Sequence, residues 1–238
     1  PALPPDALII VPARHLVLFP GIVLPFTLGR PKSIAAAQQA ARTEHPIGIV
    51  LQRDPTIADP APGDLYEVGT VAAILRYLTA PDGNHHLVCQ GQQRFRVIEY
   101  LPDYACLVAL VERVADGAAT GTEIEARFEQ LKQRALDTLQ LLPNAPAELA
   151  QSVHDIQAPA QLADFIAGFM DLKPAEKQDI LATFDLVKRL DKLLWLLAHR
   201  IEVLRLSRDI GQQTRDSMET KQREYLLREQ LKTIQKEL

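Results

Sequence analysis

The chain has 238 residues, 47% hydrophobic and 24% charged, enough for a buried core in one large domain or two small ones. Its net charge of −4 makes DNA an unexpected partner, because DNA-binding domains usually carry a basic excess on one face. No apolar stretch reaches the ~18 residues of a membrane helix and residues 1–6 show no signal peptide, so a cytoplasmic protein without a membrane partner is expected.

Residues 1–116 contain short apolar runs separated by proline, glycine and asparagine, which is typical of strands joined by turns. The predicted strands are 7–11, 16–19, 22–28, 47–51, 68–78, 87–89, 95–100 and 105–114. A helix over 34–42 interrupts them, with Pro31 near its start. Many short strands with one helix predict a partly closed barrel or a sandwich.

Two cysteines, Cys89 and Cys106, lie in apolar runs and are expected to be small core residues of a cytosolic protein. His85 and His86 precede Cys89, which raises the alternative of a metal site. In a strand, His85 and Cys89 would share one face but lack a third ligand, so no metal site is expected.

Arg94 and Arg96 alternate with the apolar residues Phe95 and Val97 at the start of the predicted strand 95–100. The alternation predicts that both arginines lie on the solvent side of the strand. A contact with phosphate or an acidic peptide is the alternative.

Prolines at 20 and 25 disfavour a regular central strand around the turn at residues 19–26. Apolar side chains at such a turn can stay exposed, and an exposed apolar patch usually marks a binding surface. Core packing is the alternative for each residue. The candidate substrate-binding residues of this turn are Phe19, Ile22, Leu24 and Phe26.

After Gly121 the apolar residues recur with the period of a helix. Thr122 and Glu125 fit a capping box, and prolines near 143, 146, 159 and 174 divide the region into a small helical bundle. The fold class is therefore α+β: a β-rich lobe over 1–116, a helical lobe over 122–206 and an extended helical arm over 207–238.

The last helix carries a heptad-like seam from Val187 to Leu204 and becomes highly charged beyond Gly211. A weaker seam follows from Leu227 onwards. A helix that leaves its own core must meet a partner, continue into another domain or fray. The absence of a helix-ending signal at residue 238 suggests that the chain continues in a longer protein.

Motifs of catalysis are missing from the sequence. It contains no G-x-x-x-x-G-K-[ST] phosphate loop, no nucleophile elbow and no H-E-x-x-H. We therefore expect no enzymatic activity and no cofactor in this chain.

Four parts of the chain resemble the N-terminal region of Lon proteases. They read VPARHLVLFPGIVLPFTLGRPKSIAA (11–36), YEVGTVAAI with GQQRFR (66–74 and 91–96), IEVLRL (201–206) and METKQREYLLREQLKTIQKEL (218–238). The resemblance implies a PUA-like β-rich lobe, a helical bundle and a long protruding helix that helps to assemble a homohexamer. It also implies an ATPase that uses ATP and magnesium and a serine–lysine peptidase, both downstream of this chain.

The leading hypothesis is a substrate-recognition domain for unfolded or degron-bearing proteins in a hexameric ATP-dependent serine protease. Met218, on the charged part of the arm, is a further candidate substrate contact because its thioether is flexible and polarizable. An ordinary exposed helix position is the alternative for Met218. For the whole chain, the alternative is a purely structural element of that protease, used for oligomerisation.

Overall fold

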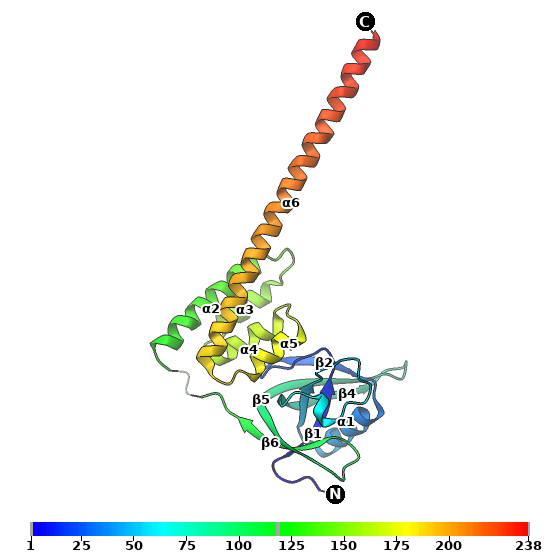
Figure 1. Cartoon of the computed structure of the whole chain (residues 1–238), viewed down its shortest axis with the longest axis vertical. Helices are drawn as coiled ribbons and strands as arrows, with labels where there is room; N and C mark the ends of the chain where they lie inside the picture. The colour runs from blue at the N-terminus through cyan, green and yellow to red at the C-terminus, as the bar shows by residue number, and fades with distance from the viewer. Residues whose placement is uncertain (1, 118–119, 238) are drawn as a thin grey trace.

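Strands fill the first part of the chain and helices the second in the computed structural model, which describes residues 2–117 and 120–237 (Figure 1). The sheet elements are β1 (Ala7–Ala13), β2 (Val23–Leu28), β3 (Ile47–Leu51), β4 (Val68–Thr79), β5 (His85–Leu101) and β6 (Val108–Val114), with α1 (Pro31–Thr43) between β2 and β3. The helices that follow are α2 (Thr122–Leu141), α3 (Ala147–Asp155), α4 (Pro159–Phe169), α5 (Pro174–Ala182) and α6 (Leu186–Glu237). The predicted α+β fold class is confirmed.

The sheet has the order β2-β5-β4-β3-β1-β6, and β5 also pairs with β6, so the strands from β5 to β6 form a partial ring with β2 beside it. This arrangement agrees with the predicted partly closed barrel. β5 is long enough to pair with β2, β4 and β6 in turn. Irregular register in the β4–β5 and β5–β6 pairs lets the long strands bend. The predicted strands 87–89 and 95–100 are therefore parts of one strand, because its polar middle pairs as well as its apolar ends.

Residues 16–19, predicted as a strand, lie in the loop between β1 and β2. Side-chain and backbone bonds hold this loop: the Thr70 hydroxyl donates to the Leu18 carbonyl at 2.5 Å, and the Gly21 amide donates to the Gly91 carbonyl at 2.8 Å. A Cβ at Gly91 would lie 2.2 Å from the Phe19 carbonyl oxygen, so only glycine allows this close approach.

Two helices start at prolines, as predicted: Pro159 and Pro174 lie in the first turns of α4 and α5. The predicted capping box at Thr122 and Glu125 is wrong. Gly121 precedes α2 with φ +121°, and no side chain caps this end. Thr122 is already helical, so its hydroxyl does not occupy the capping position.

Arg94 is the largest departure from the sequence-based picture. It is buried rather than on the solvent side, and its guanidinium donates to both carboxylate oxygens of Asp164 on α4 at 2.9 and 2.7 Å. It also donates to the Leu181 carbonyl at 2.8 Å. Burial raises the pKa of the Asp164 carboxyl, and the hydrogen bonds from Arg94 oppose that shift. Arg96 follows the prediction: it is exposed and pairs with Glu112.

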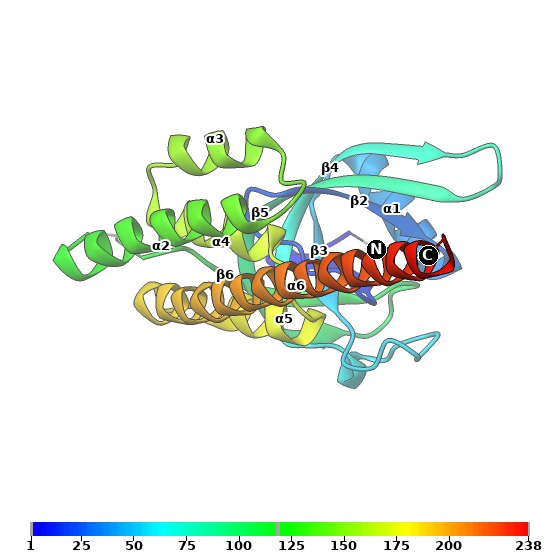
Figure 2. The ribbon, with the colours of Figure 1, turned by 90° about the horizontal axis from the view of Figure 1, so that it is seen from above.

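A continuous apolar core joins the two lobes, since buried side chains of β1, β3, α1, α2, α4 and α6 belong to one cluster. Seen from above, α2, α3 and α4 lie to one side of the sheet (Figure 2). Ile22 packs against Gly168 of α4, and the Gln178 amide donates to the Val68 carbonyl at 2.9 Å. The lobes therefore meet through packed apolar side chains and directed polar bonds.

α6 has 52 residues and a length of ~78 Å at about 1.5 Å per residue. Its first part is packed on α2 and α4, where Leu190, Leu193, Leu194, Leu197 and Ile201 are buried. Beyond Ile201 its side chains are mostly exposed, and it leaves the helical lobe as a protruding arm (Figure 1).

The cysteines and histidines of the β-rich lobe have separate surroundings. Cys89 is buried and burial raises the pKa of its thiol to about 12, whereas Cys106 is half-buried; both are free. His85 lies 2.6 Å from the Tyr77 hydroxyl and His86 lies 3.2 Å from the Thr27 hydroxyl. Over residues 2–117 and 120–237, no three acidic, histidine or cysteine side chains gather as metal ligands. Within the same ranges, no helix combines the length and apolarity needed to cross a membrane.

Candidate binding groove

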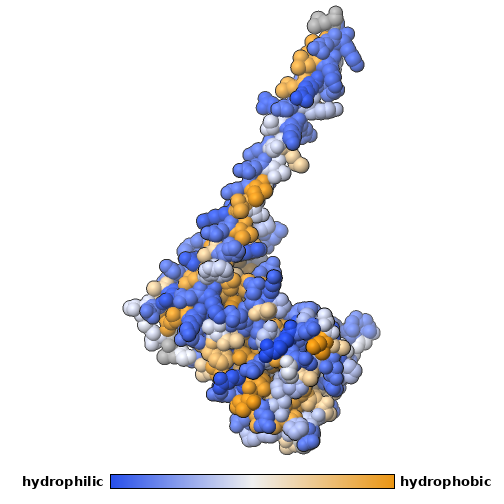
Figure 3. Space-filling view, in the orientation of Figure 1, coloured by the Kyte–Doolittle hydropathy of each residue, from blue (hydrophilic) through white to orange (hydrophobic). Residues whose placement is uncertain are grey.

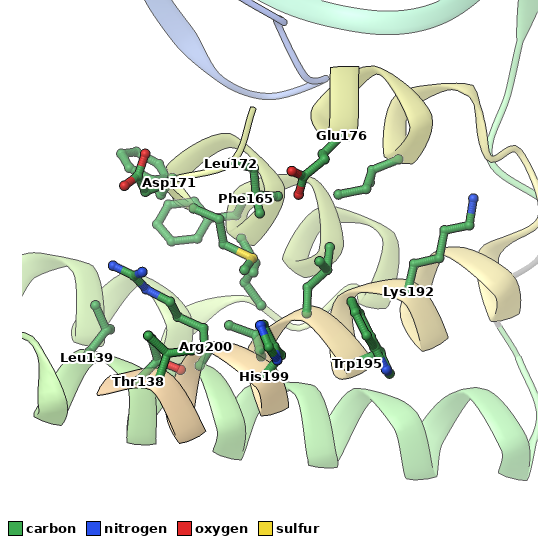
Figure 4. Close-up of a pocket in the computed structure, with 18 of the residues that line it drawn as sticks. Thr138, Leu139, Phe165, Asp171, Leu172, Glu176, Lys192, Trp195, His199 and Arg200 are labelled. Atoms are coloured by element: carbon green, nitrogen blue, oxygen red, sulfur yellow. The ribbon is translucent and has the colours of Figure 1, made fainter. Parts of the chain in front are cut away.

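A groove of about 1150 Å³ lies in the helical lobe, where α6 faces α4 and α5. The C-terminal part of α2 and one side of α3 complete its lining. Phe165, Leu172 and Glu176 lie on the wall opposite Trp195 and His199 (Figure 4). A large concave surface with a mainly apolar lining is the usual candidate for a binding site.

Large apolar side chains are exposed in this groove. Trp195 is 66% exposed, Phe169 56% and Val203 43%. Single exposed apolar residues are ordinary, but neighbours that share one concave surface usually mark an interaction site. Phe165 and Phe169 pack ring to ring at 4.7 Å between centroids, which gives the α4 wall a rigid aromatic surface.

The groove exists because α6 has more apolar surface than its neighbours cover. Its inner stripe, which includes Leu190 and Leu197, is buried against α2 and α4. A second stripe beside it contains Trp195, Leu196 and Val203 and faces the groove. α4 (11 residues) and α5 (9 residues) lie across the groove from this stripe without covering it, and Trp195 stays 66% exposed.

Charged side chains line the two edges of the groove. On the α6 side, Lys192 pairs with Asp179 across the groove at 2.7 Å. Asp171 and Glu176 lie on the α4–α5 side and make no salt bridge with any residue in 2–117 or 120–237. The α4–α5 edge therefore carries carboxylates that are available to a ligand.

The α6 edge is aromatic and basic. The His199 imidazole stacks on the Trp195 indole, with centroids 5.7 Å apart and planes 4° apart. Arg200 follows on the same helix and lies across the groove from Asp171 (Figure 4). The stacked pair gives this edge of the groove a flat aromatic surface.

The apolar surface continues from the groove onto the arm. Leu206 and Ile210 follow Val203 at three- and four-residue steps, which places all three on one helix face. Leu206 is 61% exposed and Ile210 55%. In Figure 3 apolar atoms gather along the lower arm and again near its tip, with a hydrophilic stretch between them.

The turn predicted to expose an apolar patch is buried. Phe19, Ile22 and Phe26 are 0%, 7% and 8% exposed, and Leu24 is half-buried against the same core. The prediction of an exposed patch is therefore wrong, because β5 and α4 cover this turn. A role of these four residues in substrate binding stays a prediction.

Met218 is 66% exposed on the arm, as expected for a residue outside the core. It lies ~22 Å beyond Val203 along α6, at about 1.5 Å per residue, so the structure does not bring it together with the turn or with the groove. Its contact with substrate stays a prediction.

Sequence reasoning missed the groove residues Trp195, Phe169 and Val203. A signal was present, since Trp195 is the only tryptophan of the chain and stands beside the heptad seam rather than in it. An apolar residue next to a complete seam widens the apolar face beyond what one neighbour covers.

The sequence matches the protein family described as ATP-dependent protease La (LON) substrate-binding domain over residues 7–199. It is 51% identical to the Lon protease of Methylocella silvestris over 98% of this chain, and 50% identical to the Lon protease of Phenylobacterium zucineum over 99% of it. The chain covers only 29% and 30% of the length of these two relatives.

Solved structures agree with this match. The N-terminal domain of the Mycobacterium avium complex Lon protease superimposes with a TM-score of 0.67 at 25% identity, covering 81% of this chain and 98% of that one. A Lon N-terminal domain protein from Xanthomonas campestris shares the fold, with a TM-score of 0.57 at 20% identity, covering 79% of this chain and 96% of that one. The chain therefore belongs to the family of LON substrate-binding domains.

Proposed function

We propose that the groove along α6 binds apolar segments of protein substrates, and that the chain recognises substrates for an ATP-dependent protease. The observation that carries this proposal is the exposed cluster of Trp195, Phe169 and Val203 on one concave surface. The family match supports a substrate-binding role for the chain, and the groove offers that role a surface.

The whole protein is proposed to be a cytoplasmic serine endopeptidase that degrades misfolded and degron-bearing proteins. Protease activity of the whole protein is supported by the relatives at 50–51% identity, which are named Lon protease and of whose length this chain covers 29–30%. ATP and magnesium would act in the downstream ATPase and not in this chain. Assembly into a homohexamer would multiply weak apolar contacts, because linked sites bind a long substrate with high effective concentration.

Binding of a permanently unfolded, carboxymethylated protein to the chain tests the proposal. Val203→Asp and Phe169→Asp place a charge in the groove and are expected to weaken binding at least about ten-fold. Leu78→Asp is the matched control, because Leu78 is 45% exposed on β4, outside the groove. Equal binding by all four proteins, or no binding by the unaltered chain, would contradict the proposal.

A second candidate function is assembly, supported by the tip of the arm. Leu227, Leu231 and Ile234 are 52%, 57% and 55% exposed and follow one another at heptad spacing. Leu231→Asp should lower the mass of any self-associated species in sedimentation velocity. If the unaltered chain and the variant are equally monomeric, the tip does not assemble this chain by itself.

Met218 is proposed to touch substrate in the full-length enzyme, since its flexible side chain is 66% exposed on the arm. Met218→Asp should slow degradation of an unfolded substrate while basal ATP hydrolysis is retained. Unchanged degradation by an intact assembly would make Met218 ordinary surface.

A further inference from the structure

The groove is lined mostly by helices, with the short α4–α5 connection at residues 170–172 completing one wall, and none of the strands β1 to β6 contributes to it. A helix uses its backbone N–H and C=O groups internally, so the groove offers no strand edge to pair with. An extended segment buried there would leave its own backbone groups facing apolar side chains. A helical segment would satisfy them within itself, which favours a helix as the occupant.

The exposed face of α6 has the spacing that a second helix requires. Leu196, His199, Val203, Leu206 and Ile210 follow one another at three- and four-residue steps, as the seam positions of paired helices do. From Lys192 to Ile210 this face is ~27 Å long at about 1.5 Å per residue, or about five helical turns. The groove forms the first part of this face, and the free arm forms the rest.

The charges beside this face define the polar side of the occupant. Asp171 and Glu176 lie across the groove, and Glu202 and Asp209 follow one edge of the exposed stripe seven residues apart. Within 2–117 and 120–237, none of these four carboxylates forms a salt bridge. Of the two cations that α6 adds to the lining, Lys192 is already paired with Asp179 and Arg200 forms no salt bridge with the described residues. An occupant with basic side chains beside its apolar face complements this arrangement.

We propose that the groove, together with the α6 face from Val203 to Ile210, binds an amphipathic α-helix of a substrate protein whose polar flank is basic. This inference rests on the proposed function and specifies the conformation and charge of the recognised segment. Partly folded proteins present such helices when the element that normally covers the apolar face has come away.

The fluorescence of the sole tryptophan reports binding directly, because Trp195 lines the groove and peptides without tryptophan add no indole emission of their own. Four peptides of about 20 residues are compared, long enough to cover the exposed face as helices. The first is an amphipathic helix of leucine and lysine, and the second has the same composition with the leucines spread around the helix. The third is the first with two central prolines, which break a helix, and the fourth replaces lysine by glutamate.

The first peptide is expected to shift Trp195 emission to shorter wavelength and to bind at least about ten-fold more tightly than the other three. Fluorescence anisotropy of labelled peptides provides an independent affinity. Equal affinity of the proline-containing peptide would overturn the helical occupant, and equal affinity of the glutamate peptide would overturn the basic flank.

Variants locate the bound helix. Glu176→Lys should weaken the lysine peptide about three- to ten-fold and strengthen the glutamate peptide, whereas Glu129→Lys, on the exposed side of α2 outside the groove, should change neither affinity. Ile210→Asp should weaken the first peptide, and Ile98→Asp, at a 64% exposed position on β5, should not. Binding unaffected by both Glu176→Lys and Ile210→Asp would place the helix elsewhere and overturn the site.

The outcome for the unfolded protein separates the two proposals. If Val203→Asp weakens binding of the unfolded protein but the four peptides bind alike, the groove recognises substrates without selecting a helix, and only this inference fails. If neither the unfolded protein nor any peptide binds, the proposed function and this inference fail together.

Discussion

Two apolar regions of this chain, the turn at residues 19–26 and the groove along α6, have opposite surroundings. Phe19 is fully buried, although prolines interrupt its segment, whereas Trp195 is 66% exposed, although it lies in a regular helix. The difference comes from the neighbours. Gly91 and α4 approach the turn closely enough to cover it, while the side of α6 that carries Trp195 faces an open groove. Exposure was decided by what packs against each segment and not by its own composition.

The sharpest test of this comparison removes the buried aromatic ring. Phe19→Ala is expected to lower the free energy of unfolding by about 3–5 kcal/mol, because it opens a cavity in the shared core. Urea unfolding followed by circular dichroism measures the change. A loss below about 1 kcal/mol would mean that the turn is not packed as described.

The contact between the two lobes includes the buried ion pair of Arg94 and Asp164, and removing this pair should lower the free energy of unfolding. Arg94→Ala is expected to cost a similar amount, about 3–5 kcal/mol, since it leaves the Asp164 carboxylate buried without a partner. Arg96→Ala, two residues along the same strand, removes an exposed pair and should cost at most about 1 kcal/mol. Similar losses for the two variants would contradict the burial of Arg94.

In the arm beyond Gly211 the expected effect is smaller and concerns local helix stability. Its side chains have few neighbours, so amides of 212–237 should exchange with solvent much faster than those of 190–204. Gly211→Ala should slow exchange around residue 211 by up to about five-fold, because alanine stabilises a helix interior by about 1 kcal/mol relative to glycine. Protection of 212–237 equal to that of 190–204 would show that a partner, such as another copy of the chain, already covers the arm.

The groove should give the smallest effect on stability. Trp195→Ala is expected to change the free energy of unfolding by no more than about 0.5 kcal/mol, since the side chain is mostly exposed. The same variant should weaken binding of the unfolded protein. A loss of stability comparable to that of Phe19→Ala would mean that Trp195 is a core residue and that the groove is closed in solution.

The burial of Arg94 could not be predicted from the alternation of residues along the strand. Alternation of polar and apolar residues indicates which side chains share a face of a strand, but both faces of this part of β5 are covered by protein. The same face is open to solvent two residues further along the strand, where Arg96 follows the simple rule. No pattern near Arg94 in the sequence identifies Asp164 as its partner, because Asp164 is 70 residues away. The pair forms only when α4 packs on the sheet.

Most of the local structure could be predicted from the residues alone: the change from strands to helices near residue 121, the proline-marked helix starts, and the inner seam of α6 from Leu190 to Ile201. These features depend on periodicity and backbone restriction, which act over a few residues. Packing between distant segments makes β5 one continuous strand, buries Phe19 in the core and places Trp195 in a groove. Burial depends on which distant segments meet, and short-range patterns do not contain that information.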